Sequence, residues 1–375
     1  MRKPGPSGFL RVVALVATLT SGIQQTASGS IADLFGFGGD SGKIAKLEFR
    51  LRDSFDVTTV AWSPNGQYIA TAGIFSNRIH IWDVKRRAIV KEMALEASGK
   101  HEHDLAWSPQ GDYLAACAQE GLKVFATNTW ALVTSFSGSH MGVCDQPVFS
   151  SDGRVLALLS FPTLERFEVA GWRLTSQLPL TLKLIHAIAY LPGTHTLLLA
   201  GGEYTGKETH FGRIWFLKAD EVIPGRSILA YDTGAISGHG GDALSLAVSA
   251  DGTRVATGTF TGAGYPPYVI TDSVHILDVA SGVLLGAPLD GVAKIGDAAT
   301  TGNETGLAYT PDGRFIIVGY ASLYASVIHL VDAKSFKVAD TFHGSGVVYD
   351  IAVDPQGTEF AAGSGDQVIV WSLPR

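Results

Sequence analysis

Residues 60–66 read Val-Ala-Trp-Ser-Pro-Asn-Gly, a short strand-forming run that ends in a tight turn. The pattern returns as Leu-Ala-Trp-Ser-Pro-Gln-Gly at 105–111, Leu-Ala-Tyr-Thr-Pro-Asp-Gly at 307–313 and Ile-Ala-Val-Asp-Pro-Gln-Gly at 351–357. Weaker copies centre on Phe149, Tyr190 and Val248. The chain therefore contains seven copies of one unit.

The spacing of the copies predicts the fold. The anchor residues are Trp62, Trp107, Phe149, Tyr190, Val248, Tyr309 and Val353, and the successive gaps are 45, 42, 41, 58, 61 and 44 residues. A period of about 40–45 residues is typical of a propeller in which each unit is one four-stranded blade. We therefore expect an all-β, seven-bladed β-propeller.

The two ends of the propeller are expected to meet. The seventh unit stops after its third strand, because the chain ends at residue 375. Ahead of the first unit, Lys46–Arg52 alternates charged and apolar residues, which is the pattern of a half-buried strand. This N-terminal strand is predicted to pair with Gln367–Leu373, complete the last blade and leave no open edge inside the ring.

The first residues are typical of an export signal: two basic residues precede an apolar stretch at 9–19, and small residues follow. We expect a signal peptide at 1–28, a Gly/Ser-rich linker at 29–43 and a single propeller domain at 44–375. The apolar stretch is shorter than the roughly 20 residues of a membrane-spanning helix. The mature chain is thus expected to have no stable membrane span and to be periplasmic or extracellular.

The composition and motifs of the chain limit the kinds of partner and cofactor that we expect it to bind. A net charge of −7 and a charged fraction of 17% give no basic field, so we expect no nucleic-acid partner. No nucleophile elbow or haem-attachment motif occurs, and we expect no cofactor. In an oxidising compartment, Cys117 and Cys144 could form a disulfide; two buried thiols are the alternative.

With its Trp82-Asp83 dipeptide, its Gly238-His239 pair and its repeat, the chain resembles the WD40-repeat family of seven-bladed propellers. Trp82-Asp83 matches the family's terminal dipeptide, and Gly238-His239 matches its Gly-His element. The resemblance implies a buried His, Ser, Asp and Trp hydrogen-bond network, which we expect only in the last blade, through His343, Ser364, Asp366 and Trp371. Elsewhere we expect apolar packing to hold the blades. A seven-bladed envelope propeller outside this family is the competing classification.

The longer gaps indicate where a site lies. In a propeller, the loops between blades and those between second and third strands share one face, here called the top face. The additional residues are assigned to top-face connections of blades four to six, at 203–213, 222–242, 261–273, 289–305 and 320–324, and the bottom turns are expected to stay short. We predict a recognition surface for a protein or peptide there. Its residues are Tyr204, Phe211, Tyr231, Tyr265, Pro266, Pro267, Tyr268, Tyr320 and Tyr324.

Other interpretations stay open. The long loops are alternatively insertions without function. His101, His103 and Asp104 are weak candidates for a metal site. Six acidic residues fall near the starts of first strands, at the top mouth of the central channel: Asp56, Asp104, Asp145, Asp242, Glu304 and Asp350. They would suit a cation or a basic partner segment, or serve a metal- or small-molecule-dependent propeller enzyme such as a lactonase-like hydrolase; hydrogen bonding of strand ends is their ordinary role. We favour a non-enzymatic scaffold that is a monomer within a complex, and a structural module of an envelope assembly is the third possibility.

Overall fold

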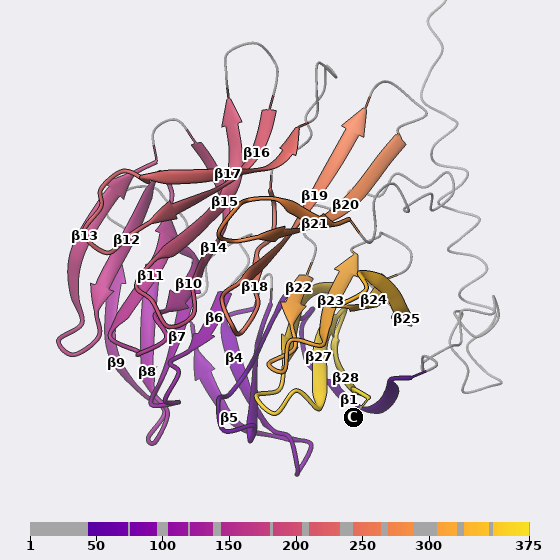
Figure 1. Cartoon of the computed structure of the whole chain (residues 1–375). Coiled ribbons are helices and arrows are strands. Elements are labelled where there is room, and N and C mark those ends of the chain that lie inside the picture. The colour runs from indigo at the N-terminus through magenta and orange to yellow at the C-terminus, as the bar shows by residue number, and fades with distance from the viewer. Residues whose placement is uncertain are drawn as a thin grey trace, which may run out of the picture. The chain divides into compact units, whose positions relative to one another are not determined.

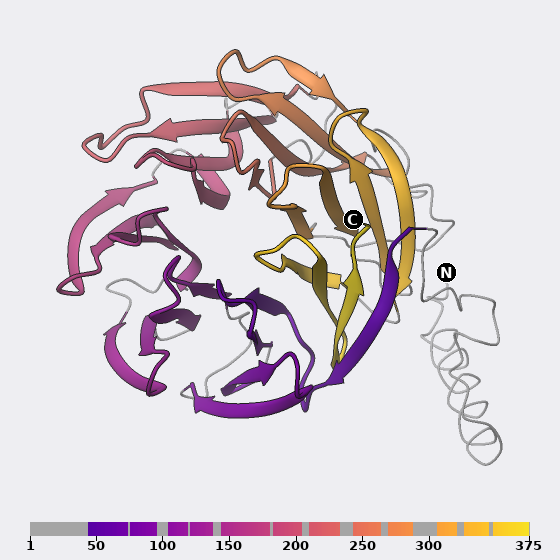
Figure 2. The same cartoon turned by 60° about the horizontal axis from the view of Figure 1, so that its bottom comes forward.

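The computed structural model describes twelve ranges of the chain. They are residues 44–73, 76–95, 104–118, 121–137, 144–180, 183–204, 210–232, 243–263, 269–287, 306–320, 326–344 and 348–374. Within them the chain forms strands β1 to β28, arranged as seven four-stranded antiparallel sheets in a ring (Figures 1 and 2). The predicted seven-bladed propeller is confirmed.

Each blade contributes an innermost strand, two middle strands and an outermost strand. Blade 1 is β2 (Thr59–Trp62), β3 (Tyr68–Ala72), β4 (Arg78–Asp83) and β5 (Ala88–Ala94). Blade 2 is β6 (Asp104–Trp107), β7 (Tyr113–Ala118), β8 (Gly121–Ala126) and β9 (Ala131–Ser137). Blade 3 is β10 (Cys144–Phe149), β11 (Val155–Ser160), β12 (Thr163–Glu168) and β13 (Arg173–Pro179).

The remaining blades follow the same order. Blade 4 is β14 (Lys183–Tyr190), β15 (Leu197–Tyr204), β16 (His210–Leu217) and β17 (Arg226–Asp232). Blade 5 is β18 (Ala247–Val248), β19 (Arg254–Ala263), β20 (Val269–Asp278) and β21 (Leu284–Gly286). Blade 6 is β22 (Gly306–Tyr309), β23 (Phe315–Tyr320), β24 (Ser326–Asp332) and β25 (Lys337–Gly344), and blade 7 is β26 (Val348–Val353), β27 (Glu359–Ser364), β28 (Gln367–Ser372) and β1 (Lys46–Arg52).

The N-terminal strand closes the ring as predicted. β1 pairs with β28 in antiparallel register from Lys46↔Ser372 to Arg52↔Gln367. Just before β1, the backbone N–H groups of Ile44 and Ala45 donate to Asp340 Oδ2 in blade 6, at 2.8 and 3.2 Å. The start of the described chain is therefore tied to two neighbouring blades.

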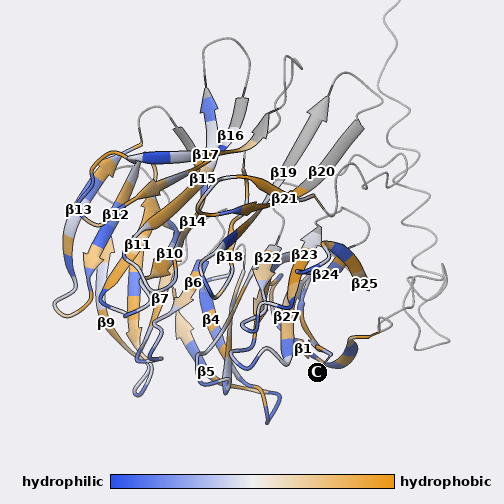
Figure 3. Cartoon of the chain, viewed as in Figure 1, coloured by the Kyte–Doolittle hydropathy of each residue, from blue (hydrophilic) through white to orange (hydrophobic). Residues whose placement is uncertain are grey.

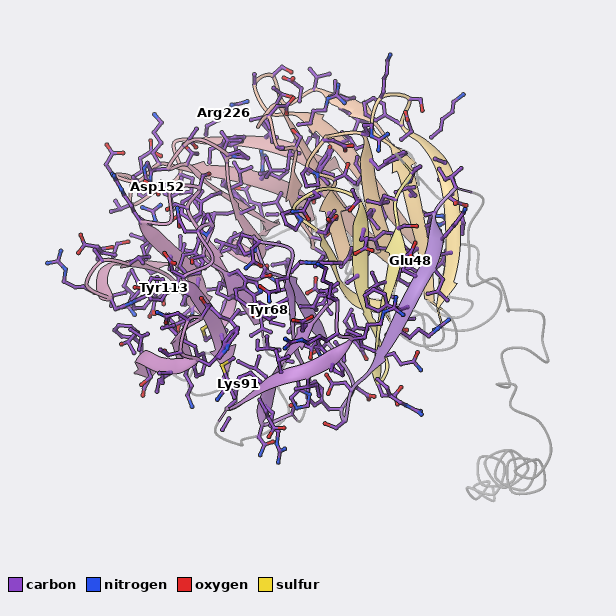
Figure 4. The ribbon with its side chains drawn as sticks, turned by 90° about the horizontal axis from the view of Figure 1, so that it is seen from below. Glu48, Tyr68, Lys91, Tyr113, Asp152 and Arg226 are labelled. Carbon is purple, nitrogen blue, oxygen red and sulfur yellow. A yellow bond between two sulfur atoms is a disulfide. The ribbon has the colours of Figure 1, made fainter. Side chains whose placement is uncertain are left out.

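The repeated Ser-Pro-Xaa-Gly phrase forms the turn between the first and second strands. In the first copy, Ser63 Oγ accepts the Tyr68 N–H at 2.8 Å and donates to Asn65 Oδ1 at 2.7 Å, while Gly66 adopts a φ of 73°. This left-handed conformation explains the glycine, since other residues adopt it at a cost. Figure 4 shows the face that carries these turns, with Tyr68 and Tyr113 of neighbouring blades labelled. We call it the bottom face.

The cores lie between blades. The middle strands are apolar along most of their length because both of their faces are covered, as in Leu156–Leu159 of β11 (Figure 3). Between blades 6 and 7, Phe342, Phe360 and Trp371 are almost fully buried, and the rings of Phe360 and Trp371 stack at 5.0 Å. Packing of blade on blade is the main source of stability.

Each of the seven outermost strands carries one β-bulge. The extra residues are Glu48, Val90, Val133, Thr175, Ala230, Leu285 and Ala339. A bulge interrupts the regular row of main-chain donors and acceptors at a sheet edge, and so hinders pairing with another chain. The outer edges of this propeller are therefore protected in every blade.

Cys117 and Cys144 form a disulfide, so the alternative of two buried thiols is wrong. Cys117 belongs to β7 and Cys144 to β10, with a Cα–Cα distance of 5.0 Å, and both residues are buried. The bond therefore covalently joins blades 2 and 3 near the top face.

Two expectations about the connections are corrected. Residues 222–225 are not part of a top-face connection: they lie in the bottom-face turn Lys218–Gly225, which is longer than the four-residue turn at 84–87 in blade 1. The bottom turns are thus not all short, because Glu221 stabilises the longer one by accepting the Lys218 N–H at 3.0 Å. On the top face, residues 261–263 and 269–273 are strand rather than loop, because β19 and β20 continue as a hairpin.

Candidate functional site

The seven innermost segments surround a cavity of about 320 Å³ on the axis of the ring. Its lining includes the carboxylates of Asp104, Asp145 and Asp350, the imidazole of His186 and the phenol of Tyr349. No Lys or Arg is among the described residues that line it. The predicted convergence of acidic residues on the channel is therefore seen for three of the six.

The carboxylate of Asp350 links blade 7 to blade 1. Its Oδ2 accepts the Val60 N–H at 2.9 Å and the Thr59 hydroxyl at 3.1 Å, and its Oδ1 accepts the Ile351 N–H at 2.8 Å. Burial raises the pKa of Asp350 to about 6, and the nearby charge of Asp104 adds to the rise. The carboxylate thus titrates closer to neutrality than an ordinary aspartate.

Asp104 has the equivalent role one blade further on. Its Oδ2 accepts the Gln146 N–H at 2.8 Å, which joins blade 2 to blade 3. Asp104 and Asp350 both stand three residues before their anchors, Trp107 and Val353. At this offset the carboxylate reaches the next innermost strand, so hydrogen bonding of strand ends occupies these two groups.

Of the remaining acidic and metal-site candidates, the structure describes only Asp56. Asp56 is exposed and does not line the cavity. Asp242, Glu304, His101 and His103 lie outside the described residues. In the part of the chain that the structure describes, no three His, Cys, Asp or Glu side chains are grouped so that they could hold a metal ion.

The predicted aromatic surface is placed only in part. Tyr204 ends β15 opposite His210, Phe211 lies in β16 opposite Glu203, and Tyr231 lies in β17 opposite Gly212. These three backbones belong to one blade, and Tyr320 ends β23 in blade 6. Tyr265, Pro266, Pro267, Tyr268 and Tyr324 lie outside the described residues. The recognition surface itself stays a prediction.

Blade 1 contains a buried polar network that the sequence analysis missed. Asp53 Oδ1 accepts a hydrogen bond from His80 Nδ1 at 2.7 Å, and Asp53 Oδ2 accepts one from the Thr71 hydroxyl at 2.8 Å. The Trp82 indole N–H in turn donates to Thr71 Oγ1 at 3.1 Å. The side chains of Asp53 and His80 are only 0% and 3% exposed, so water does not compete for these bonds. The hydrogen bond to Asp53 raises the pKa of His80.

The expectation that apolar packing alone holds the blades outside blade 7 is therefore wrong. A signal for the network was present, because Asp53 stands nine residues before Trp62, the offset at which His239 precedes Val248. In blade 1, Asp53 stands where the family pattern has a histidine. The histidine of this network, His80, lies instead in the third strand, two residues before Trp82. Because Asp53 and not a histidine stands at that offset, the family's histidine pattern does not reveal the network.

The network predicted for blade 7 is not assembled by the described side chains. Ser364 Oγ is buried without a hydrogen-bond partner among them, and Asp366 pairs with Arg52 at 2.7 Å instead. Trp371 is buried as expected, whereas nothing describes the side chain of His343. The role of His343 stays a prediction.

Comparison with known proteins completes the evidence on the family. The model of the WD domain, G-beta repeat, matches residues 46–83 and 336–372. Each match begins at or next to an outermost strand and ends at the third strand of the next blade, so both matches cover the junctions around ring closure. The chain is a WD40-repeat propeller. A search of the curated proteins found no match to this WD40 propeller.

Proposed function

We propose that this WD40 propeller is a non-enzymatic scaffold that binds a protein or peptide partner through the top face of blades 4 to 6. WD40 propellers are generally protein-interaction scaffolds. The observation that carries the proposal is the one-sided extension of the blades: β15 and β16 have eight residues each, and β19 and β20 have ten. Their hairpins project from the top face (Figure 1). A rigid ring that displays long hairpins on one side suits partner recognition.

The alternative, an enzyme or metal-dependent protein that uses the acidic channel, fits the geometry less well. Asp104 and Asp350 are engaged in hydrogen bonds between blades. A carboxylate that holds two strand ends together cannot leave its partners for a ligand without a loss of stability. We therefore assign these two groups a structural role and propose that the chain acts as a monomer within a complex.

We further propose that the protein is exported to the cell envelope or beyond. The disulfide between Cys117 and Cys144 supports this location, because such bonds persist in oxidising compartments. The signal-like residues 1–28 and the linker at 29–43 agree with it. Among the described residues, no helix is long and apolar enough to cross a membrane.

Affinity capture from a cell-envelope extract tests the proposal. One variant replaces residues 261–273 by a two-residue turn, and the control replaces the bottom-face turn 218–225 by a four-residue turn. We expect the first change to reduce capture of specific partners at least tenfold, and the control to capture as the wild type does. Equal capture by the wild type and both variants would reject the top face as the binding surface.

A further inference from the structure

The blade 5 hairpin extends beyond the strands that flank it. β19 and β20 pair in unbroken register from Arg254↔Asp278 to Ala263↔Val269. β18 pairs only with Val255 and Ala256, and β21 only with Ile276 and Leu277. The hairpin from Thr257 and His275 outward therefore has no further strand on either side among the described residues (Figure 1).

The backbone geometry shows which groups β19 presents to its inner side, the side of β18. Gly258 donates its N–H to Ser245 Oγ at 3.0 Å, and its carbonyl accepts the Leu244 N–H at 2.8 Å. Both groups of Gly258 therefore point away from β20. Because this direction alternates along a strand, Phe260 and Gly262 present their N–H and C=O groups to the same side. No described strand pairs with these two residues on that side.

This edge lacks the protection that the other edges have. Each outermost strand of the ring carries a bulge, whereas the β19–β20 register shows none, like the pairing of second and third strands in the other blades. Residues 255–263 of β19 include no proline and no charged residue. An unguarded, regular edge is a template for a further strand, and proteins that do not use such an edge commonly block it. This part of β19 therefore has the features of an edge that can accept a further strand.

We propose that the inner edge of β19, the edge on the side of β18, binds at Thr259–Ala263 an extended segment of a protein partner as an added β-strand. The proposal rests on the proposed function and specifies how the top face recognises its partner. The main chain supplies the hydrogen bonds through Phe260 and Gly262, so alternate residues of the ligand must offer a free N–H. The uncharged edge suits a segment of β-branched and small residues better than a charged one.

Peptides selected on the wild-type protein from a random twelve-residue library are the probes for this site. Gly262→Pro removes the N–H that points away from β20, towards the side of β18. Ile270→Pro is the matched control, because Ile270 is the cross-strand partner of Gly262 and its N–H points to the opposite edge of the hairpin. Circular dichroism and thermal unfolding check that both variants fold. We expect Gly262→Pro to weaken peptide binding at least tenfold and Ile270→Pro to change it less than twofold. Equal effects of the two prolines, including no effect of either, would overturn strand addition at this edge.

Two further measurements separate the remaining outcomes. N-methylation of a selected peptide should abolish binding at every second residue, and the amides of Phe260 and Gly262 should exchange more slowly once the peptide is bound. Peptides that bind the top face without either effect would support the proposed function and reject strand addition. Protection of these amides in the free monomer would show that the chain itself covers the edge, and a dimer lost in Gly262→Pro would show that a second copy does; both results would overturn the proposal.

Discussion

Trp130 of blade 2 packs edge-on against Tyr68 of blade 1, with 5.8 Å between the ring centroids and 83° between the ring planes. Trp172 of blade 3 makes the same contact with Tyr113 of blade 2, at 5.1 Å and 88°. Both tryptophans occupy turns with positive φ, 59° and 47°. In each contact an aromatic residue held in the left-handed conformation packs on the first residue of a second strand in the preceding blade. The bottom ends of blades 1, 2 and 3 are linked in this way.

Replacing Trp130 separates the packing of its ring from the strain of its backbone. Trp130→Ala should destabilise the protein by about 2 kcal/mol, since the ring is half-buried and its edge-on contacts are lost. Trp130→Gly should cost about 1 kcal/mol less than the alanine variant, because glycine adopts positive φ freely. Urea denaturation measures both. A glycine variant less stable than the alanine variant would show that the backbone at this turn is not strained.

Removing Asp53 should unravel the polar network of blade 1. Asp53→Ala leaves His80 and Thr71 buried without their acceptor, and we expect a loss of about 3 kcal/mol in the free energy of unfolding. Asp56→Asn, at an exposed carboxylate three residues away, should change stability by less than about 0.5 kcal/mol. Because the pKa of His80 is raised, its contribution is complete below pH 6.5 and is lost as the pH rises through the folded-state value. A pH dependence above pH 6.5 that is as large in Asp53→Ala as in the wild type would contradict the assignment.

Reduction of the Cys117–Cys144 disulfide should lower the free energy of unfolding by about 3 kcal/mol, because the bond closes a loop over a separation of 27 residues. Denaturation with and without a reducing agent measures the difference. The double variant Cys117→Ala, Cys144→Ala is the control, and its free energy of unfolding should be the same with and without the reducing agent. Identical curves for the oxidised and reduced wild type would show that the bond adds no stability.

Asp350 should make the protein more stable in mild acid. Its folded-state pKa of about 6 lies above the ordinary value of 3.8, so between these values the native state binds a proton that the unfolded chain does not. The free energy of unfolding should therefore rise as the pH falls from 7 towards 4, by at most about 3 kcal/mol. Asp350→Asn should flatten this rise. Thermal unfolding from pH 4 to pH 7 checks it, and parallel curves for the wild type and the variant would reject the role of Asp350.

The closure of the ring predicts a sharp contrast within β1. Leu51 is 2% exposed and packs in the core between blades 7 and 1, whereas Glu48 is the exposed bulge residue of the same strand. Leu51→Ala should cost about 3 kcal/mol, and Glu48→Ala less than about 0.5 kcal/mol. Limited proteolysis between residues 44 and 52 should become faster only in the first variant. An undiminished stability of Leu51→Ala would mean that β1 does not hold the ring together.

The extent of prediction from sequence differs between elements. The turn residues Ser63 and Gly66 can be predicted from the sequence, because each meets a local requirement of the turn. Ser63 supplies a hydroxyl group that accepts a backbone N–H, and Gly66 adopts a positive φ. The sequence predicts a loop where β19 and β20 continue, because Gly262 and the residues around it lack the strict alternation of apolar and polar side chains that indicates a strand. The network of Asp53, His80 and Thr71 was missed because its members come from three segments that meet only after folding.

The sequence by itself determined the number of blades, the bottom-face turns between first and second strands and the pairing of the two ends, since repeat period, turn chemistry and a missing strand are local properties of the chain. Only the tertiary structure decided which carboxylates join neighbouring blades, that Cys117 meets Cys144 and which strand edge has no partner strand among the described residues. These features depend on distances between segments that lie far apart in the chain, and packing between blades sets those distances.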